Sequence, residues 1–110
     1  MEINKKEIAS RAIKLFVENE GKEVARASLY FIKNDLHEEP YGILEDVFVD
    51  ESLRGQGIGT NLVNKIIETA KGNKCYKLLA TSRHERPKVH ALYERLGFKN
   101  HGIEFRMDLE

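Results

Sequence analysis

The hydrophobic pattern of this 110-residue chain changes period at one glycine-rich stretch, and this change constrains the fold more than any other feature. Before the stretch Glu51-Ser-Leu-Arg-Gly-Gln-Gly-Ile-Gly-Thr-Asn-Leu-Val63, apolar residues alternate or form short runs, which is typical of β-strands. After it, apolar residues recur at helical spacing, at Leu62, Val63, Ile66, Ile67 and Ala70. A junction of this kind predicts a domain that mixes strands and helices.

Three strands are expected before the glycine-rich stretch. Ile13, Leu15 and Val17 share one face of a strand over 12–18. The polar residues 19–22 form a turn, and the strand 24–33 follows it, so these strands predict a hairpin. The run 43–49 is apolar on both faces, which indicates a central, covered strand.

The second half of the chain alternates between the two kinds of element. The helix over 60–71 should stop at Gly72, and a short strand is expected over 75–81. Pro87 suits the first turn of a second helix, which should end at Gly97. The alternation over 103–109 is the most regular in the sequence and predicts a last strand. The expected fold class is therefore α/β (α+β), with a mixed, mostly antiparallel central sheet, flanking helices and one domain over 1–110.

The composition excludes several classes of protein. Eighteen basic and eighteen acidic residues cancel, whereas nucleic-acid binders usually carry a basic excess, so no nucleic-acid partner is expected. Cys75 is the only cysteine, which rules out an internal disulfide and favours a cytoplasmic location. The charged N-terminus does not have the pattern of a signal peptide, and no apolar run approaches the roughly 20 residues of a membrane helix.

The glycine-rich stretch has the chemistry of a phosphate-binding loop. A helix N-terminus leaves backbone N–H groups unpaired, and glycines allow a ligand to approach this backbone closely. Arg54 could add a charge-assisted contact. The stretch lacks the third glycine of the Rossmann spacing and the Gly-Lys-Ser/Thr of the Walker loop. A plain glycine-rich turn is the structural alternative.

The spacing that fits is R-x-x-G-x-G, formed by Arg54, Gly57 and Gly59. It resembles the coenzyme A pyrophosphate motif of the GNAT superfamily of N-acetyltransferases. The later stretch Val89-His-Ala-Leu-Tyr-Glu-Arg-Leu-Gly-Phe98 resembles the second signature of that family. The resemblance covers residues 43–109 and implies a GNAT-like (acyl-CoA N-acyltransferase) fold.

The resemblance also implies a cosubstrate and a place for it. Acetyl-CoA would lie where two central strands splay apart, with its pantetheine against the backbone of Val47, Phe48 and Val49. Backbone N–H groups would hold its pyrophosphate, from Arg54, Gly55, Gln56, Gly57, Ile58, Gly59 and Thr60. An amine would then attack the acetyl carbon directly in a ternary complex, without a metal.

Two residues are candidates for the proton transfers of this reaction. Tyr93 matches the general acid of the family, although a tyrosine on a helical apolar stripe is also a common core residue. Glu45 is the preferred general base, because regular alternation places it on the same face as Val47 and Val49. A solvated carboxylate is an equal alternative for Glu45, and Asp46 is a weaker candidate.

Other polar residues give weaker signals. Arg86 stands where the family often has Asn, so Arg86 and Arg83 could reach coenzyme A phosphates or remain surface residues. The four histidines form no H-x-x-x-H pair, so no metal site is expected. Cys75 has no nearby His in sequence and is interpreted as a packing residue.

Family members usually place a strand and one or two helices before the hairpin, whereas only about ten residues stand there in this sequence. The chain therefore resembles a minimal member with an open acceptor groove, or one completed by a second subunit. The acceptor would be a small-molecule or protein amine, and a homodimer is one assembly that fits. The alternatives are a non-catalytic acyl-CoA-binding or regulatory module and a nucleotide-binding domain.

Overall fold

The computed structural model describes residues 1–110, which form two compact units, Met1–Leu79 and Ala80–Glu110. Each unit is described by itself. That the whole chain acts as one domain stays a prediction. None of the helices has both the length and the apolar character that a membrane crossing requires.

The first unit begins with the predicted hairpin. Strand β1 spans Ala12–Asn19 and pairs antiparallel with β2, which spans Lys22–Ile32. The turn between them consists of Glu20 and Gly21, with φ angles of 54° and 77°. Two successive positive φ angles match the right-handed twist of a hairpin. The turn expected over 19–22 is confirmed.

The sheet has four strands in the order β1-β2-β3-β4, so β3, Tyr41–Val49, is an inner strand as predicted. Strand β4, Leu78–Ala80, is shorter than the predicted run 75–81. The N–H of Tyr76 donates to the Pro40 carbonyl (3.0 Å) and that of Gly42 to the Lys77 carbonyl (2.9 Å). Because these bonds join the starts of β3 and β4, the two strands run in the same direction and the sheet is mixed.

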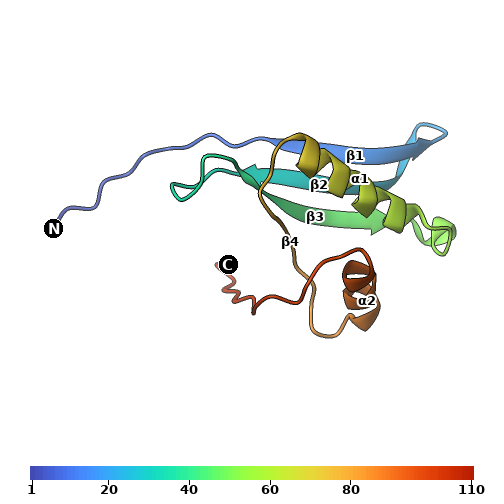
Figure 1. The fold of residues 1–110 in the computed structure, drawn as a ribbon. Coiled ribbons are helices and arrows are strands. Elements are labelled where there is room, and N and C mark those ends of the chain that lie inside the picture. Colours follow the sequence, from blue (N-terminus) through green and yellow to red (C-terminus); the bar gives the residue numbers. More distant parts are fainter. The chain divides into compact units, whose positions relative to one another are not determined.

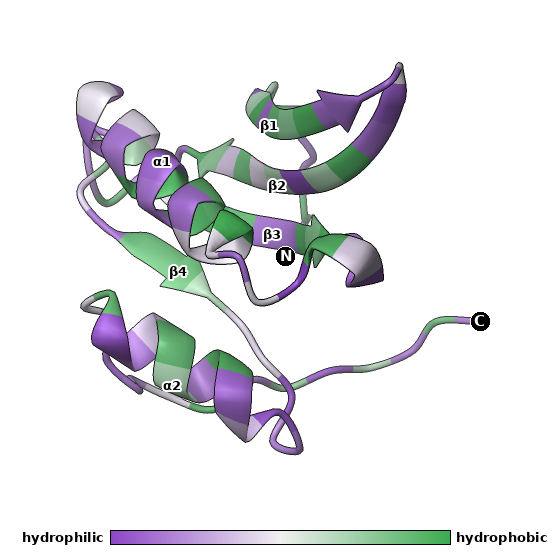
Figure 2. Cartoon of the chain, turned by 90° about the vertical axis from the view of Figure 1, so that its right-hand side faces the viewer, coloured by the Kyte–Doolittle hydropathy of each residue, from purple (hydrophilic) through white to green (hydrophobic).

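Helix α1, Ile58–Gly72, lies across one face of the β1–β3 sheet (Figure 1). Along the helix, hydrophilic purple alternates with hydrophobic green in Figure 2, as expected for an amphipathic element. The predicted stripe is confirmed, since its buried members are Leu62, Val63, Ile66 and Ala70. They meet β2 residues that are buried on the same face, namely Ala25, Ala27, Leu29 and Phe31.

A β-bulge interrupts β3 shortly before its end. Arg26 pairs with Phe48 and Ser28 pairs with Glu45, so two β3 residues lie opposite one β2 residue. Asp46, within the bulge, has a φ of 55°. An extra residue reverses the alternation of the strand beyond it. The second half of β3 therefore does not follow the pattern that the sequence suggested.

The second unit contains helix α2, Pro87–Arg95, close to its predicted position. The strand expected over 103–109 is wrong for this structure, because these residues have no strand conformation. Their apolar side chains are exposed, at Ile103, Phe105, Met107 and Leu109. Alternation shows only that a segment suits a half-buried strand, whereas a strand also needs a neighbour for its backbone hydrogen bonds.

Candidate functional site

The predicted phosphate-binding loop joins the end of β3 to α1. A short 3-10 helix, Glu51–Leu53, follows the strand, and Gly57 directly precedes α1. Gly55 and Gly57 have φ angles of 83° and 80°, which L-residues rarely adopt. A Cβ atom at either position would meet nothing within 4 Å. The two glycines are thus required by the backbone conformation, and they leave open space above the loop.

Gly59 plays a different part. Its φ is not in the left-handed region, and a Cβ there would lie 3.6 Å from Cγ2 of Val49, in ordinary contact. The first turn of α1 therefore packs against the end of β3. In the protein without a ligand, neither the backbone conformation nor steric crowding requires a glycine at residue 59.

The N-terminus of α1 has no side-chain cap. Its first internal bond runs from the Asn61 N–H to the Gly57 carbonyl (3.0 Å), and the N–H groups of residues 58–60 find no acceptor in the protein. Unpaired N–H groups and the helix dipole together favour an anion at this end. The loop therefore suits a pyrophosphate, since it combines unpaired N–H donors with glycines that have open space around them.

Arg54 and Asp50 shape the start of the loop. The Arg54 Nε–H donates to the Val49 carbonyl at 3.1 Å, which holds the guanidinium at the loop. The Ser52 hydroxyl donates to Asp50 and lowers the pKa of this carboxyl from its usual value, and the charges of Lys22 and Arg54 act in the same direction. Arg54 thus brings positive charge beside the unpaired N–H groups.

The backbone of Val47, Phe48 and Val49, the predicted pantetheine contact, lies just before this loop. Strand β4 has three residues and starts beside the start of β3, so it ends before it reaches their level. On that side these residues have no strand partner, and the Val49 carbonyl instead accepts from Arg54. Hydrogen-bonded pairs alternate along the ladder, and the Asp50 N–H donates to the Val24 carbonyl (2.8 Å), so the backbone groups of Phe48 point to β2 and those of Val49 point to the free side. The backbone is therefore open to the predicted contact at Val49 but not at Phe48.

The bulge changes the face of Glu45. Regular alternation would put Glu45 with Val49, but the register pairs Glu45 with Ser28 and Val49 with Ala25. Since residues 25 and 28 point to opposite faces of β2, Glu45 lies opposite to Val49 and shares its face with Phe48. The predicted shared face was wrong, whereas the exposure of Glu45 leaves it accessible for a role as base.

Asp46 is held by Arg26, a contact that the sequence did not suggest. The Arg26 Nε–H donates to Asp46 Oδ2 (2.8 Å), and its Nη2 donates to Oδ1 (3.2 Å). These two bonds lower the pKa of the Asp46 carboxyl from its usual value. Hydrogen bonds from Lys14 and Arg26 likewise lower the pKa of the Glu23 carboxyl. The guanidinium also lies 4.7 Å from the Phe48 ring centroid. Asp46 therefore stabilises the bulge, and no local sequence signal marks residues 26 and 46 as partners.

Tyr93 lies in the second unit, at the end of α2. The Phe98 N–H donates to the Tyr93 carbonyl (2.9 Å), and the Gly97 N–H donates to the Glu94 carbonyl (3.1 Å). With Gly97 at a φ of 104°, this is a Schellman motif. The rings of Tyr93 and Phe98 lie 5.3 Å apart, which is the apolar contact that often accompanies this motif. The position of Tyr93 is thus fixed by the helix end.

Arg86 directly precedes α2. Its carbonyl accepts from the N–H groups of Val89 and His90, both at 3.2 Å, and its side chain is exposed. A His90 ring nitrogen lies 2.8 Å from the Arg83 carbonyl, so His90 is tied to the turn before the helix. Burial raises the pKa of the Cys75 thiol, with Arg11 opposing the shift, which agrees with packing and not with a reactive thiolate.

The fold and the loop define a mixed-sheet domain with an uncapped helix N-terminus suited to anions. A model of the acetyltransferase (GNAT) family matches residues 3–98, and the chain belongs to this family. The glucosamine 6-phosphate N-acetyltransferase of Trypanosoma brucei brucei is 40% identical over 68 residues, which are 62% of this chain and 44% of that protein. The chain thus spans less than half the length of this curated relative.

Two solved structures share the fold. Glucosamine-6-phosphate N-acetyltransferase from Arabidopsis thaliana is 29% identical, with a TM-score of 0.79 over 90% of this chain and 67% of that one. A transcriptional regulator from Bacillus halodurans C-125 is 28% identical, with a TM-score of 0.82 over 89% of this chain and 66% of that one.

Proposed function

We propose that the chain binds acetyl-CoA at the 54–60 loop and transfers the acetyl group to a primary amine. The observation that carries the proposal is the uncapped N-terminus of α1, preceded by two positive-φ glycines with open space above them. The family supplies the identity of the ligand, since its members are acetyltransferases.

Each residue has a role in the proposed reaction. The N–H groups of the loop and the Arg54 guanidinium neutralise the pyrophosphate. The backbone groups of β3 that face away from β2, such as those of Val49, hold the pantetheine arm. Glu45 accepts the proton of the attacking amine, directly or through water, because an amine must be neutral to attack. Tyr93 donates a proton to the departing thiolate of coenzyme A.

The expected acceptor is an amino sugar phosphate of the glucosamine 6-phosphate class. The support is the activity for which the relatives from Trypanosoma brucei brucei and Arabidopsis thaliana are named. With acetyl-CoA present, glucosamine 6-phosphate should be acetylated at least about tenfold more efficiently than glucosamine, since a lost phosphate contact costs about 1.4 kcal/mol or more. The measurement is the specificity constant kcat/KM for glucosamine 6-phosphate, for glucosamine and for a peptide that contains lysine. Faster acetylation of the peptide would contradict the sugar phosphate and favour a protein amine.

A second candidate is an acyl-CoA-binding module without turnover. The observation that favours this second candidate is the solved structure of a transcriptional regulator from Bacillus halodurans C-125, which has a TM-score of 0.82 with this chain. Binding of acetyl-CoA without acetylation of any amine would distinguish this function from the transferase.

The binding step is tested by a pair of substitutions at Gly57. Asn and Asp both tolerate a positive φ, and both can cap a helix, so Gly57→Asn and Gly57→Asp differ mainly in charge. We expect Gly57→Asp to bind acetyl-CoA at least about tenfold more weakly than Gly57→Asn, because a carboxylate beside the pyrophosphate costs about 1.4 kcal/mol or more. Isothermal titration calorimetry measures both dissociation constants.

The controls separate the cosubstrate from any other anion. Wild type should bind acetyl-CoA and coenzyme A but not NAD, and thermal unfolding should show that both variants remain folded. Equal affinities of the Asn and Asp variants would refute a pyrophosphate at this loop. Preference for NAD would refute the coenzyme A assignment.

A further inference from the structure

Ser28 is the only buried residue of the chain with a polar side chain, and it is 7% exposed. It lies in β2, directly between Lys14 of β1 and Glu45 of β3. Its hydroxyl makes no hydrogen bond within the protein. Because buried polar groups are normally paired, an unpaired hydroxyl in the middle of a sheet needs a physical explanation.

The Ser28 hydroxyl is nevertheless open to water. Every fully buried polar side-chain atom of the chain has a hydrogen-bond partner, so the Ser28 Oγ, which has none, must reach solvent. Its neighbours on the sheet face are all larger, namely Arg26 and Tyr30 along β2 and Lys14 and Glu45 across the adjacent strands. These longer side chains account for the burial of a serine among residues that are themselves wholly or partly exposed.

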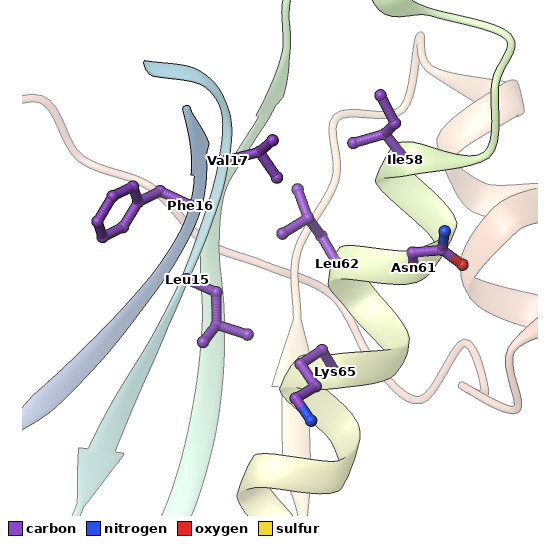
Figure 3. Close-up of a pocket in the computed structure, with 7 residues that line it drawn as sticks. All are labelled: Leu15, Phe16, Val17, Ile58, Asn61, Leu62 and Lys65. Carbon is purple, nitrogen blue, oxygen red and sulfur yellow. The ribbon is translucent and has the colours of Figure 1, made fainter. Parts of the chain in front are cut away.

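Ser28 points to the face of the sheet that α1 does not cover. In Figure 3, Leu15 of β1 points toward α1, whereas Phe16 points to the other side. Alternation puts Lys14 on the side of Phe16, and the register places Ser28 opposite Lys14 and Glu45 opposite Ser28. The hydroxyl of Ser28 and the carboxylate of Glu45 therefore lie side by side on one face.

The cationic neighbours of Ser28 are paired with other residues. Lys14 and Arg26 both form ion pairs with Glu23. The Glu45 side chain, in contrast, makes no ion pair and no hydrogen bond. The two polar groups on this part of the face that have no protein partner are thus the Ser28 hydroxyl and the Glu45 carboxylate, which are directly opposed.

Ser28 and Glu45 are close enough to share one small ligand. The Phe31 N–H donates to the Arg11 carbonyl at 3.0 Å, so every second residue of β2 counted from Phe31 bonds to β1, whereas Ser28 bonds to β3. Ser28 and Glu45 are therefore a hydrogen-bonded pair, with Cα atoms about 5.5 Å apart. A water molecule between their side chains can donate one hydrogen bond to each of them.

We propose that Ser28 is a positioning residue for acetyl transfer, because together with Glu45 it holds the water molecule through which the acceptor amine loses its proton. This inference rests on the proposed function of the chain. The water donates one hydrogen bond to the Glu45 carboxylate and one to the Ser28 Oγ, and it accepts one from the ammonium group of the acceptor.

The proton transfer balances without a further reactant. An N–H proton of the ammonium group passes to the water oxygen, while the water proton that faces Glu45 passes to the carboxylate. The electron pair of the broken N–H bond stays on nitrogen, the water is restored, and Glu45 becomes a carboxylic acid. Ser28 keeps its own proton and acts only by fixing the direction of the water.

Matched substitutions at residue 28 test the role of the hydroxyl. Thr and Val have nearly the same shape and both suit a strand, but only Thr keeps a hydroxyl. We expect kcat of Ser28→Val to be about tenfold lower than that of Ser28→Thr, because one hydrogen bond to the water is lost. The KM of the acceptor and the dissociation constant of acetyl-CoA should be the same in both variants, since the water takes part only in the chemical step.

The kinetics use the best acceptor of the wild type among glucosamine 6-phosphate, glucosamine and a lysine peptide, and calorimetry measures acetyl-CoA binding. Urea denaturation shows whether the variants are folded. If the added methyl group unfolds both of them, Ser28→Ala against wild type makes the same comparison without added atoms.

A second set of variants tests whether Ser28 acts through Glu45. Glu45→Gln should lower kcat by about a hundredfold, within the usual range for loss of a general base. In this background Thr and Val at residue 28 should give equal kcat, since no carboxylate is left to receive the proton. A role of Ser28 in sheet packing would instead lower kcat by the same factor in both backgrounds.

The remaining outcomes would overturn the inference. Equal kcat for Ser28→Thr and Ser28→Val in an active enzyme, or an unchanged kcat in Glu45→Gln, would refute the relay and leave acetyl transfer itself intact. A rise in the KM of the acceptor without a fall in kcat would mean that the hydroxyl binds the acceptor directly. A wild type that acetylates no amine would refute the proposed function, and the role of Ser28 with it.

Discussion

If Tyr93 is the general acid of the proposed transferase, replacing it with Phe should lower kcat for the proposed acceptor, glucosamine 6-phosphate, by about a hundredfold, within the usual range for loss of a general acid. The KM for acetyl-CoA should change little, because the substitution removes only the hydroxyl. The Schellman bonds use the backbone of residue 93, and its contact with Phe98 uses the ring, so both remain in the variant. Steady-state kinetics measures kcat and KM separately.

Tyr76→Phe is the matched control. The Tyr76 hydroxyl accepts a bond from Asn34 at 3.3 Å at the start of the sheet, away from the loop in the sequence, and its loss should leave kcat unchanged. An unchanged kcat in Tyr93→Phe would mean that Tyr93 serves only the end of α2. A rise in KM without a fall in kcat would assign the hydroxyl to binding and not to proton transfer.

Ile66→Ala should produce the largest loss of stability. Ile66 is fully buried in α1 against the sheet, so its truncation should lower the free energy of unfolding by about 2–5 kcal/mol. The midpoint of urea denaturation should fall with an unchanged m-value, which shows a change in stability alone.

The neighbouring Ile67 provides the control, because it has the same side chain but is only half-buried. Ile67→Ala should cost about 1 kcal/mol, since less apolar surface is removed from the core. Equal losses at both positions would contradict the packing of α1 by the stripe of residues 62, 63, 66 and 70. A folded Ile66→Ala would also report whether a loosened α1 weakens acetyl-CoA binding at its N-terminus.

The features that depend on near neighbours were predictable from the sequence. The hairpin turn at Glu20 and Gly21, the apolar stripe of α1 and the start of α2 at Pro87 each follow from a few adjacent residues. The place of the glycine loop, between a strand and a helix, was predictable for the same reason, and Gly57 directly precedes α1.

Features that depend on distant residues were not predictable in this way. The bulge at Asp46 depends on Arg26, twenty positions earlier, and alternation assumes that no such bulge exists. The prediction for the face of Glu45 was therefore wrong, whereas the residue is exposed. The strand predicted over 103–109 is absent for a related reason. An alternating pattern in one segment does not provide the neighbouring strand with which that segment must pair. The roles of Tyr93 and Glu45 stay predictions.

The bulge also sets how β3 tolerates changes of length. Removal of Asp46 would leave Val47 alone opposite Ala27, so Phe48 and Val49 would keep their partners Arg26 and Ala25 and therefore their faces. Since the glycine loop starts directly after Val49, it would stay in register with the sheet, and the deletion would remove only the carboxylate that Arg26 holds. The bulge is therefore a place where this strand can absorb a change of length, and descendants of this sequence should lose a residue there sooner than between Phe48 and Arg54.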